Sequence, residues 1–554
     1  MTRGRRLAWA VLLGSLVLSC RAAAPAPAAP PRRVLLLSLD GAGAATLRRL
    51  YREGKLTAGG FARFFREGQV ADRLIPVDPT LTSPNHVSLA TGYPAGRTGI
   101  VSNVFHPAGA PFPETVSGFA APIATETLWE AARRQGKRVG INSWPGADGN
   151  GPRRRGDWGM TYTNTPDLPA ALVAAGSSGW EEAAKAREIA AERLAPLPPG
   201  RWTDLPCRID LPGAASRTAT CPVKPLGPGR IYFGAVYPLP AYPGAFASAL
   251  AGAGLFWPGP PDDDRLLDAW DGRPGLDLDT WLEQSERFAR FFGDALLLAA
   301  RRPDWDLLMG YMPVIDEAEH QLQLVAPRQP GFTPERRDEL AAARARVWQE
   351  VDRQLARLLA AIDLRTTVVA VVSDHGMAPV HTLLRPNVLL RERGLLGSAW
   401  AVGDGGLVHV YLKPGRADLL PTLRGLFTAW KVGDEAPVER AFTRREAAEI
   451  QLDHPDSGDL ILFLREGYMA DQDSATGEAA SPTGVYGMHG YLSSHPEMHG
   501  IYMALGPGIL SGGAGTVRNL EIAGRVAGWL GIEKPRPQVS PGTLIALSPS
   551  RKGG

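Results

Sequence analysis

Three short and almost purely apolar runs constrain the fold of this chain more than any other feature. They are Val34–Leu39, Asp306–Met312 and Val368–Ser373. Continuous apolar runs of this length are typical of strands that are buried on both faces, as in parallel sheets. Stretches with a helical pattern of apolar residues lie between them, notably 333–362. The pattern predicts an α/β fold with a largely parallel central sheet.

Polar residues follow each of the three runs. Ligands of open α/β sheets bind beyond the carboxyl ends of the strands, so side chains at these ends are candidates for a site. Asp40 directly follows the first run, and Asp374 and His375 follow the third. After the second run come Asp316 and His320, whose spacing of four places them on one face of a helix.

A further candidate lies in the stretch Pro79–His86. Thr82 or Ser83 is expected to cap a helix that Pro84 opens, since proline is well tolerated in the first helical turn. A helix N-terminus favours negative charge, such as an alkoxide or a phosphoryl oxygen. An ordinary helix cap explains this stretch equally well when it is taken alone.

The candidates together form a set that suits metal binding. Carboxylate and imidazole ligands without thiolate are typical of catalytic zinc, and Mn²⁺ or iron would also fit. The set is Asp40, Thr82, Asp316, His320, Asp374, His375 and His489.

The order of these motifs resembles the nucleotide pyrophosphatase/phosphodiesterase family of the alkaline phosphatase superfamily. The resemblance extends from about residue 33 to 510. It is carried by Leu39-Asp40-Gly41, Thr82-Ser83-Pro84-Asn85-His86, Thr91-Gly92-Tyr93-Pro94, Gly99-Ile100-Val101-Ser102-Asn103, Trp144-Pro145-Gly146, Asp316 to His320, Ser373-Asp374-His375-Gly376-Met377 and His489-Gly490-Tyr491.

The resemblance implies a three-layer α/β/α sandwich and a hydrolase of phosphate esters with two zinc ions. One ion would be bound by Asp40, Thr82, Asp374 and His375, and the other by Asp316, His320 and His489. Thr82 would be the nucleophile and would form a phospho-threonine intermediate, and Asn85 would hydrogen-bond a phosphoryl oxygen. A small-molecule phosphodiester is the expected substrate, and no nucleic-acid partner is expected.

Two positions depart from the family pattern. Ser83 stands where an aromatic residue often follows the nucleophile and stacks on a base, and Leu492-Ser493 replaces a usual Asp-Asn pair. Weak selectivity for the nucleobase is therefore expected, unless Tyr232 or Trp257 supplies an aromatic face. A phosphomonoesterase or a phosphonate hydrolase of the same superfamily remains an alternative, and a non-catalytic surface lipoprotein is a further one.

Composition adds few constraints on function. The chain has 554 residues with 44% hydrophobic and 21% charged residues, and its net charge of +3 points to no nucleic-acid or membrane-surface partner. The basic run Arg153–Arg155 lies among Gly and Pro and reads as a solvated loop.

The first residues read as an export signal. Arg3, Arg5 and Arg6 precede the apolar run Leu7–Leu18, and Val17–Cys20 resembles a bacterial lipobox with Cys20 as the lipidated residue. A plain cleaved signal peptide is the alternative. The expected location is the bacterial periplasm or cell envelope, where the two remaining cysteines, Cys207 and Cys221, would form a disulfide.

These features suggest a division of the chain. Residues 1–20 are the expected signal, residues 21–31 an Ala/Pro-rich tether, and residues 32–545 the catalytic domain. Changes of composition place insertions in that domain at about 147–303 and 385–480.

Overall fold

The computed structural model describes residues 33–537, apart from 162–167, 254–275 and the short stretches 175, 191–192, 195–196, 212–213, 228, 237–240 and 243. The expected signal and tether therefore lie outside the described residues, as does Trp257. Within the described part, no helix is both long and apolar enough to cross a bilayer.

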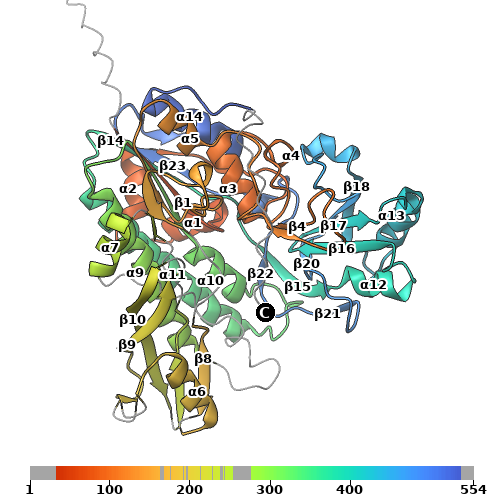
Figure 1. The fold of residues 1–554 in the computed structure, drawn as a ribbon, viewed down its shortest axis with the longest axis horizontal. Coiled ribbons are helices and arrows are strands. Elements are labelled where there is room, and N and C mark those ends of the chain that lie inside the picture. The colour runs from red at the N-terminus through yellow and green to blue at the C-terminus, as the bar shows by residue number, and fades with distance from the viewer. Residues whose placement is uncertain are drawn as a thin grey trace, which may run out of the picture.

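A mixed but mainly parallel sheet forms the centre of the protein (Figure 1). Across the described residues its strand order is β12-β7-β6-β13-β1-β14-β23-β2-β24. The five strands from β7 to β14 run parallel, whereas β23 pairs with β14 in the antiparallel sense. The bounds are β1 Arg33–Leu39, β2 Gln69–Val70, β6 Val139–Asn142, β7 Trp158–Met160, β12 Ala241–Tyr242, β13 Leu307–Met312, β14 Thr367–Val372, β23 Tyr502–Leu505 and β24 Gly512–Gly513.

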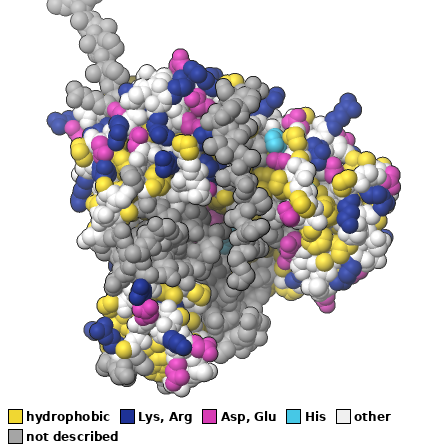
Figure 2. Space-filling model, in the orientation of Figure 1, with side chains coloured by type: hydrophobic (Ala, Val, Ile, Leu, Met, Phe, Trp, Pro, Cys, Tyr) yellow, Lys and Arg dark blue, Asp and Glu magenta, His cyan; other side chains and the backbone are white. Residues whose placement is uncertain are grey.

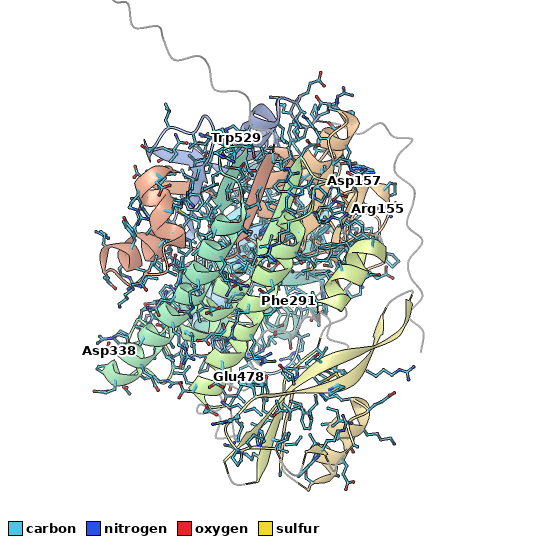
Figure 3. The ribbon with its side chains drawn as sticks, turned by 90° about the vertical axis from the view of Figure 1, so that its left-hand side faces the viewer. Arg155, Asp157, Phe291, Asp338, Glu478 and Trp529 are labelled. Carbon is cyan, nitrogen blue, oxygen red and sulfur yellow. A yellow bond between two sulfur atoms is a disulfide. The ribbon has the colours of Figure 1, made fainter. Side chains whose placement is uncertain are left out.

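The apolar runs form the strands because both of their faces are covered by helices. Among the described residues, one face of β1 and its neighbours packs on a layer of helices in which α9 and α11 run side by side across the sheet (Figure 3). These helices are α1 Ala44–Arg52, α2 Gly60–Glu67, α9 Leu278–Ala300, α10 Val314–Leu322 and α11 Pro334–Ala361. The other face packs on α3 Thr82–Thr91, α5 Leu128–Arg134 and α14 Ile522–Leu530. The predicted three-layer α/β/α sandwich is confirmed.

A small lobe projects from the sandwich at the lower end of Figure 1. Its sheet has the order β8-β11-β10-β9, and helix α6 packs beside it, whereas α7 packs against the edge of the central sheet. The bounds are β8 Ala171–Ala174, α6 Ser178–Ala186, β9 Thr203–Leu211, β10 Ala214–Leu226, β11 Arg230–Phe233 and α7 Gly244–Gly252. Cys207 on β9 and Cys221 on β10 form the expected disulfide, with their Cα atoms 5.7 Å apart.

A second lobe lies to the right in Figure 1 and has its own apolar core. An antiparallel sheet with the order β16-β17-β19-β18 is its main element, and a smaller sheet of β15, β20, β21 and β22 joins it to the sandwich. The bounds are β15 Ala378–Leu384, α12 Pro386–Glu392, β16 Ala399–Asp404, β17 Leu407–Leu412, α13 Leu420–Thr428, β18 Val438–Thr443, β19 Leu460–Leu464, β20 Gly467–Ala470, β21 Ala480–Pro482 and β22 Gly487–Met488. The small lobe falls within the first segment read as an insertion, and the second lobe extends a few residues beyond the other at both ends; the division into domains stays a prediction.

Charged side chains of both signs are interspersed over the described part of the face in Figure 2. The basic run at 153–155 is only partly the solvated loop that the sequence suggested, because Arg155 is exposed but Arg153 and Arg154 are engaged. Arg153 forms an ion pair with Glu130 at 2.7 Å, and the guanidinium of Arg154, which is largely buried, donates to Asp148 Oδ1 at 2.7 Å. Arg154 also donates to the carbonyl oxygens of Phe119 and Ala121, so the run holds neighbouring loops together.

Candidate active site

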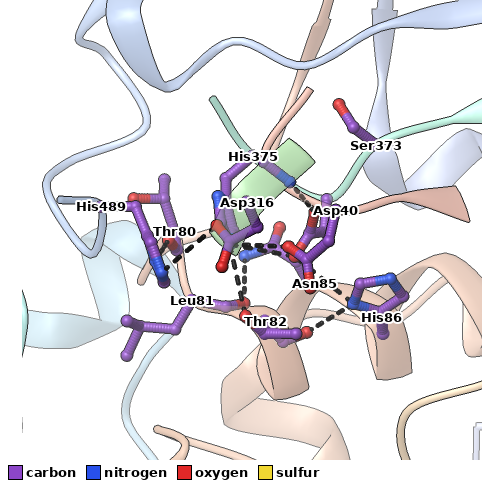
Figure 4. Close-up of polar contacts among 12 residues, drawn as sticks. Asp40, Thr80, Leu81, Thr82, Asn85, His86, Asp316, Ser373, His375 and His489 are labelled. Carbon is purple, nitrogen blue, oxygen red and sulfur yellow. Dashed lines mark hydrogen bonds and ion pairs between the residues drawn. The ribbon is translucent and has the colours of Figure 1, made fainter. Parts of the chain in front are cut away.

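The parallel strands bring five of the candidate residues to one edge of the sheet (Figure 4). Asp40 directly follows β1, while Asp374 and His375 follow β14. Asp316 and His320 lie on α10, which begins just after β13. Because β13, β1 and β14 are adjacent and parallel, their carboxyl ends coincide. The expected cluster is thus assembled by strand order.

Thr82 is the first residue of α3 and is not its N-cap. Leu81 occupies the cap and its carbonyl accepts the N–H of Asn85 at 3.1 Å, while the Leu81 side chain makes no capping bond. The prediction that Thr82 or Ser83 caps the helix is therefore wrong, because the helix begins at Thr82, two residues before Pro84. As a result the Thr82 hydroxyl is not engaged by the helix backbone and lies 3.4 Å from Nε2 of His375.

His489 reaches the site from the segment after β22. Its ring stacks on that of His375 at 3.7 Å between centroids, and its Nε2 lies 3.9 Å from Asp316 Oδ1. The chain is held there by Gly490, whose N–H donates to the Thr80 carbonyl at 3.0 Å.

The three site histidines share one hydrogen-bonding pattern. Nδ1 of His320 lies 2.8 Å from the Gly487 carbonyl, Nδ1 of His375 lies 3.0 Å from its neighbour's carbonyl, and Nδ1 of His489 lies 3.0 Å from the Thr80 carbonyl. A carbonyl oxygen only accepts, so each Nδ1 carries a proton, and in the neutral ring each Nε2 presents a lone pair to the site. This is the arrangement that metal-binding histidines adopt.

Each of the three carboxylates also has an oxygen that could coordinate a cation. Asp40 Oδ1, Asp316 Oδ1 and Asp374 Oδ2 are buried and have no hydrogen-bond partner among the described residues. Three sets of ligand atoms lie close enough to hold an ion: Asp316, His320 and His489; Asp40, Asp316 and His375; and Asp40, His86 and Asp374. Oxygen and nitrogen donors in this number fit zinc or a similar divalent ion.

Electrostatics also favour a bound cation. Burial, together with the charges of Asp374 and Asp316, raises the pKa of Asp40 well above its ordinary value. Burial also opposes ionisation of Asp374, but His375 and His86 hold its pKa well below the usual range. Burial and His375 lower the pKa of His489 to about 3. The acids repel one another, and positive charge between them would relieve that repulsion.

The two halves of the cluster differ in exposure. The side chains of Asp316 and His320 are 13% and 17% exposed, whereas those of Asp374 and His375 are fully buried. Burial opposes charge on His320, but Asp316, at 3.3 Å from its Nε2, raises the pKa of His320 to about 9. Solvent therefore reaches the site from the side of α10.

Asn85 does not fit its expected role. Its side chain is fully buried, its Oδ1 accepts the N–H of Val77 at 2.8 Å, and its Nδ2 donates to the Pro79 carbonyl at 2.8 Å and the Leu81 carbonyl at 3.1 Å. The amide is thus used to hold the loop before Thr82. A contact with a phosphoryl oxygen would require these bonds to break.

Another amide, Asn103, lies beside the first turn of α3. Its Oδ1 accepts the N–H of Ser83 at 2.8 Å, and no described residue accepts a hydrogen bond from its Nδ2. The residue is only half-buried, so Nδ2 is available to a bound anion. The motif Ser102-Asn103 was noticed in the sequence, but only the fold places it next to Thr82.

The second lobe helps to hold both sides of the site. Asp404, in the turn between β16 and β17, accepts the Ser102 hydroxyl at 2.8 Å and the Asn103 N–H at 2.9 Å. In the same turn, Gly406 donates its N–H to the His489 carbonyl at 2.8 Å. Burial raises the pKa of Asp404 to about 6 against the effect of these bonds.

The side chain at position 83, where an aromatic residue would stack on a base, is not accessible to a ligand. Ser83 is fully buried, and its hydroxyl donates to the Ser102 carbonyl at 3.1 Å. Tyr232 is fully buried in the apolar core that the lobe shares with the sandwich and so presents no face to a ligand, and Trp257 lies outside the described residues. His495 is ion-paired with Glu439 and Glu466, and Nε2 of His499 lies near the Ser493 carbonyl.

The profile of the type I phosphodiesterase / nucleotide pyrophosphatase family matches residues 34–220 and 223–492. The chain belongs to this family. It is therefore a phosphoric ester hydrolase, as the sequence resemblance implied. Every candidate site residue lies within the matched ranges.

Comparison with known proteins gives further similarities. The Xenopus laevis bis(5'-adenosyl)-triphosphatase enpp4 is 31% identical over 136 residues, a match that spans 23% of this chain and 27% of that relative. Human ectonucleotide pyrophosphatase / phosphodiesterase 5 has the same fold, with a TM-score of 0.52, 15% identity and coverage of 91% of this chain and 96% of that one. The murine protein of the same name gives a TM-score of 0.49 at 14% identity, with the same coverage.

Proposed function

We propose that this family member hydrolyses phosphodiesters at a two-zinc site with Thr82 as the nucleophile. The observation that carries the proposal is the arrangement around the Thr82 hydroxyl, where three histidines present Nε2 and three carboxylates have unpartnered oxygens. One ion would be bound by Asp40, Thr82, Asp374 and His375, and the other by Asp316, His320 and His489.

The reaction follows from these positions. The ions, when bound, would lower the pKa of the Thr82 hydroxyl and neutralise charge on the phosphoryl group. Thr82 Oγ1 would attack phosphorus, so that the Oγ1–P bond forms as the bond to the leaving oxygen breaks. Water would then attack the phospho-threonine, releasing a phosphomonoester and restoring the hydroxyl. Asn103 Nδ2, in place of Asn85, is positioned to donate to a phosphoryl oxygen.

Charge favours a diester over a monoester. Three carboxylates and one alkoxide carry about four negative charges, which two divalent cations would balance. The largest electrostatic influences on the Asp40 and Asp374 carboxyls come from other site residues, with no Arg or Lys among them. A monoester dianion would lack a cation for its second charge. A phosphomonoesterase or phosphonate hydrolase, which could use the same residues, is the second candidate.

The leaving group is the least constrained part of the proposal. The name of the Xenopus relative describes cleavage of a bis-adenosyl triphosphate, so nucleotides are the first substrates to test. Buried Ser83 offers no stacking face, and loss of aromatic stacking costs about 1–3 kcal/mol per base. We therefore propose weak discrimination between bases.

The test is a panel of substrates on the zinc-loaded enzyme. It compares kcat/KM for an aryl nucleotide diester, an aryl alkyl diester and an aryl monoester. We expect both diesters to exceed the monoester and to lie within about a hundredfold of each other. A monoester preference would assign the chain to the phosphatase branch, and no turnover of any ester by metal-loaded protein would favour a non-catalytic role.

We further propose that the protein is exported to the bacterial cell envelope and anchored through a lipid on Cys20. The basis is the lipobox-like stretch Val17–Cys20 after an apolar run. Fractionation of cells that express the wild type and Cys20→Ser tests this. Release of only the variant from membranes is expected, and a soluble, cleaved wild type would contradict lipidation.

A further inference from the structure

We infer that His86 is a positioning residue that orients Asp374 and the Thr82 end of α3 without binding a metal itself. This inference rests on the proposed metal site. His86 lies on α3, is fully buried, and was quoted in the motif without a role. It is the histidine of the third set of ligand atoms close enough to hold an ion, with Asp40 and Asp374.

The hydrogen bonds of His86 decide between a ligand and a positioning residue. Nδ1 lies 2.9 Å from the Thr82 carbonyl (Figure 4). It also lies 3.4 Å from Asp374 Oδ2, and Nε2 lies 2.8 Å from the Ser38 hydroxyl. The carbonyl only accepts, so Nδ1 carries the proton and Nε2 accepts from Ser38. A protonated nitrogen cannot coordinate a metal. The other site histidines differ because their Nε2 atoms face the carboxylates.

The ring is also fixed by its neighbours. Trp144 and Tyr311 pack edge-on against it, with centroids 5.3 Å and 5.1 Å away, and Trp144 Nε1 donates to the His86 carbonyl at 3.3 Å. Tyr311 in turn donates its hydroxyl to Asp40 Oδ2. His86 and Tyr311 therefore lie in contact, each beside one carboxylate of the same proposed ion.

This geometry gives His86 two effects. The Nδ1–H donates to the Thr82 carbonyl, and Nδ1 lies 3.4 Å from Oδ2 of Asp374, so this electrostatic contact keeps the carboxylate beside the start of α3, which carries the proposed nucleophile. Ser38 lies two residues before Asp40 on β1, so the link through Nε2 also ties α3 to the strand that delivers Asp40. Groups that orient metal ligands in this way typically change metal affinity by about 10- to 100-fold when removed.

The experiment compares His86→Asn with His86→Ala. An asparagine amide can place its nitrogen near the position of Nδ1, so it retains the donor, whereas alanine retains none. Metal affinity is measured by competition with a chelator and metal content by elemental analysis, alongside kcat and KM for an aryl diester. We expect the Asn variant to remain within about tenfold of wild type in affinity, and the Ala variant to lose about 10- to 100-fold, with kcat reduced more than KM is raised.

Ser38→Ala is the milder variant in case His86→Ala does not fold. It removes the hydroxyl that donates to Nε2 and adds no volume. Ser88→Ala is its matched control, because Ser88 is a buried serine of α3 whose hydroxyl has no partner among the described residues. Ser38→Ala should weaken metal binding several-fold, and Ser88→Ala should leave it unchanged.

Each contrary result has one meaning. His86 has no positioning role if the variants His86→Ala, His86→Asn and Ser38→Ala all bind metal as tightly as the wild type does. If both position-86 variants lose one full equivalent at saturating metal, His86 is a ligand and the inference is wrong. A wild-type chain that binds no metal would instead refute the proposed function.

Discussion

Thr82 Oγ1 lies 3.4 Å from Nε2 of His375, although 293 positions separate the two residues in the chain. The contact joins the first turn of α3 to the end of β14. A threonine hydroxyl at a helix start could be a simple cap, but this one is directed to an imidazole between carboxylates. That contact supports the proposed role of Thr82 as the nucleophile.

Replacing Thr82 by alanine should remove turnover and leave the metal bound. The remaining ligands still surround each proposed ion, and the hydroxyl makes no capping bond that the helix would lose. We expect kcat to fall by more than about a thousandfold, as for other nucleophile deletions, with metal content measured on the same samples. Ser88→Ala serves as the control on the same helix. Activity within tenfold of wild type would exclude Thr82 as the nucleophile.

The purified protein should bind two equivalents of metal. Alanine at His320 removes one of the three ligands of the more exposed ion, so metal content should fall to about one equivalent, and activity should fall with it. His381→Ala is the control, since His381 is a half-buried histidine of β15 outside the site. Elemental analysis of dialysed protein measures the content. A folded wild type with one equivalent or none would refute a two-metal mechanism.

Asp78 predicts a defined pH dependence of stability. Burial raises its pKa from the ordinary 3.8 to about 6, although it accepts hydrogen bonds from Ser493 N–H and Oγ–H. Between these pH values the folded state holds a proton that the unfolded state has lost, so this carboxyl lowers stability as pH rises from about 4 to 6.

The substitution Asp78→Asn tests this dependence, because an amide at this position does not titrate and can keep a contact with Ser493. The stability of the variant relative to wild type should therefore increase by on the order of 2–3 kcal/mol between pH 4 and 7 and then stay constant. Denaturant unfolding of both metal-free proteins at several pH values measures the difference, and the shared groups cancel. A difference independent of pH would show that Asp78 ionises normally.

The disulfide between Cys207 and Cys221 should stabilise the lobe locally. Closing a loop of this length contributes about 3 kcal/mol in chain-entropy terms. The double Cys→Ser variant should therefore become sensitive to protease within β9–β11 while the zinc-loaded core keeps its activity. Thiol titration of unfolded, unreduced protein should find no free thiol from this pair, and two reactive thiols would contradict the bond.

The site residues at strand ends could be predicted from the sequence because the order of the parallel strands determines where these residues lie. Asp40, Asp374 and His375 follow continuous apolar runs, and parallel neighbours must end at the same edge. His489 was a candidate by residue type, but only the family resemblance implied its ligand set, since it follows a two-residue strand that has no apolar signal of its own.

The side-chain amides were harder to assign. Asn85 and Asn103 both stand in motifs, and nothing local separates one that faces a ligand from one that bonds to backbone. The difference depends on contacts distant in sequence, such as Asn519, which donates to Asn85 Oδ1 at 3.1 Å, and Asp404, which accepts from Asn103. His86 was overlooked for the same reason, because its partner Ser38 lies 48 positions away.

The turn between β16 and β17 has a consequence for engineering. Asp404 accepts the backbone N–H of Asn103, and Gly406 donates its N–H to the carbonyl of His489. The second lobe therefore connects the two loops that carry Asn103 and His489. A chimera that exchanges residues 399–464 with those of another family member would need to carry this turn in register with both loops. The smallest segment that could be exchanged is thus the lobe together with residues 102–103 and 489–490. Chimeras that exchange residues 399–464 alone should fold, but the positions of Asn103 and His489 should be less well fixed.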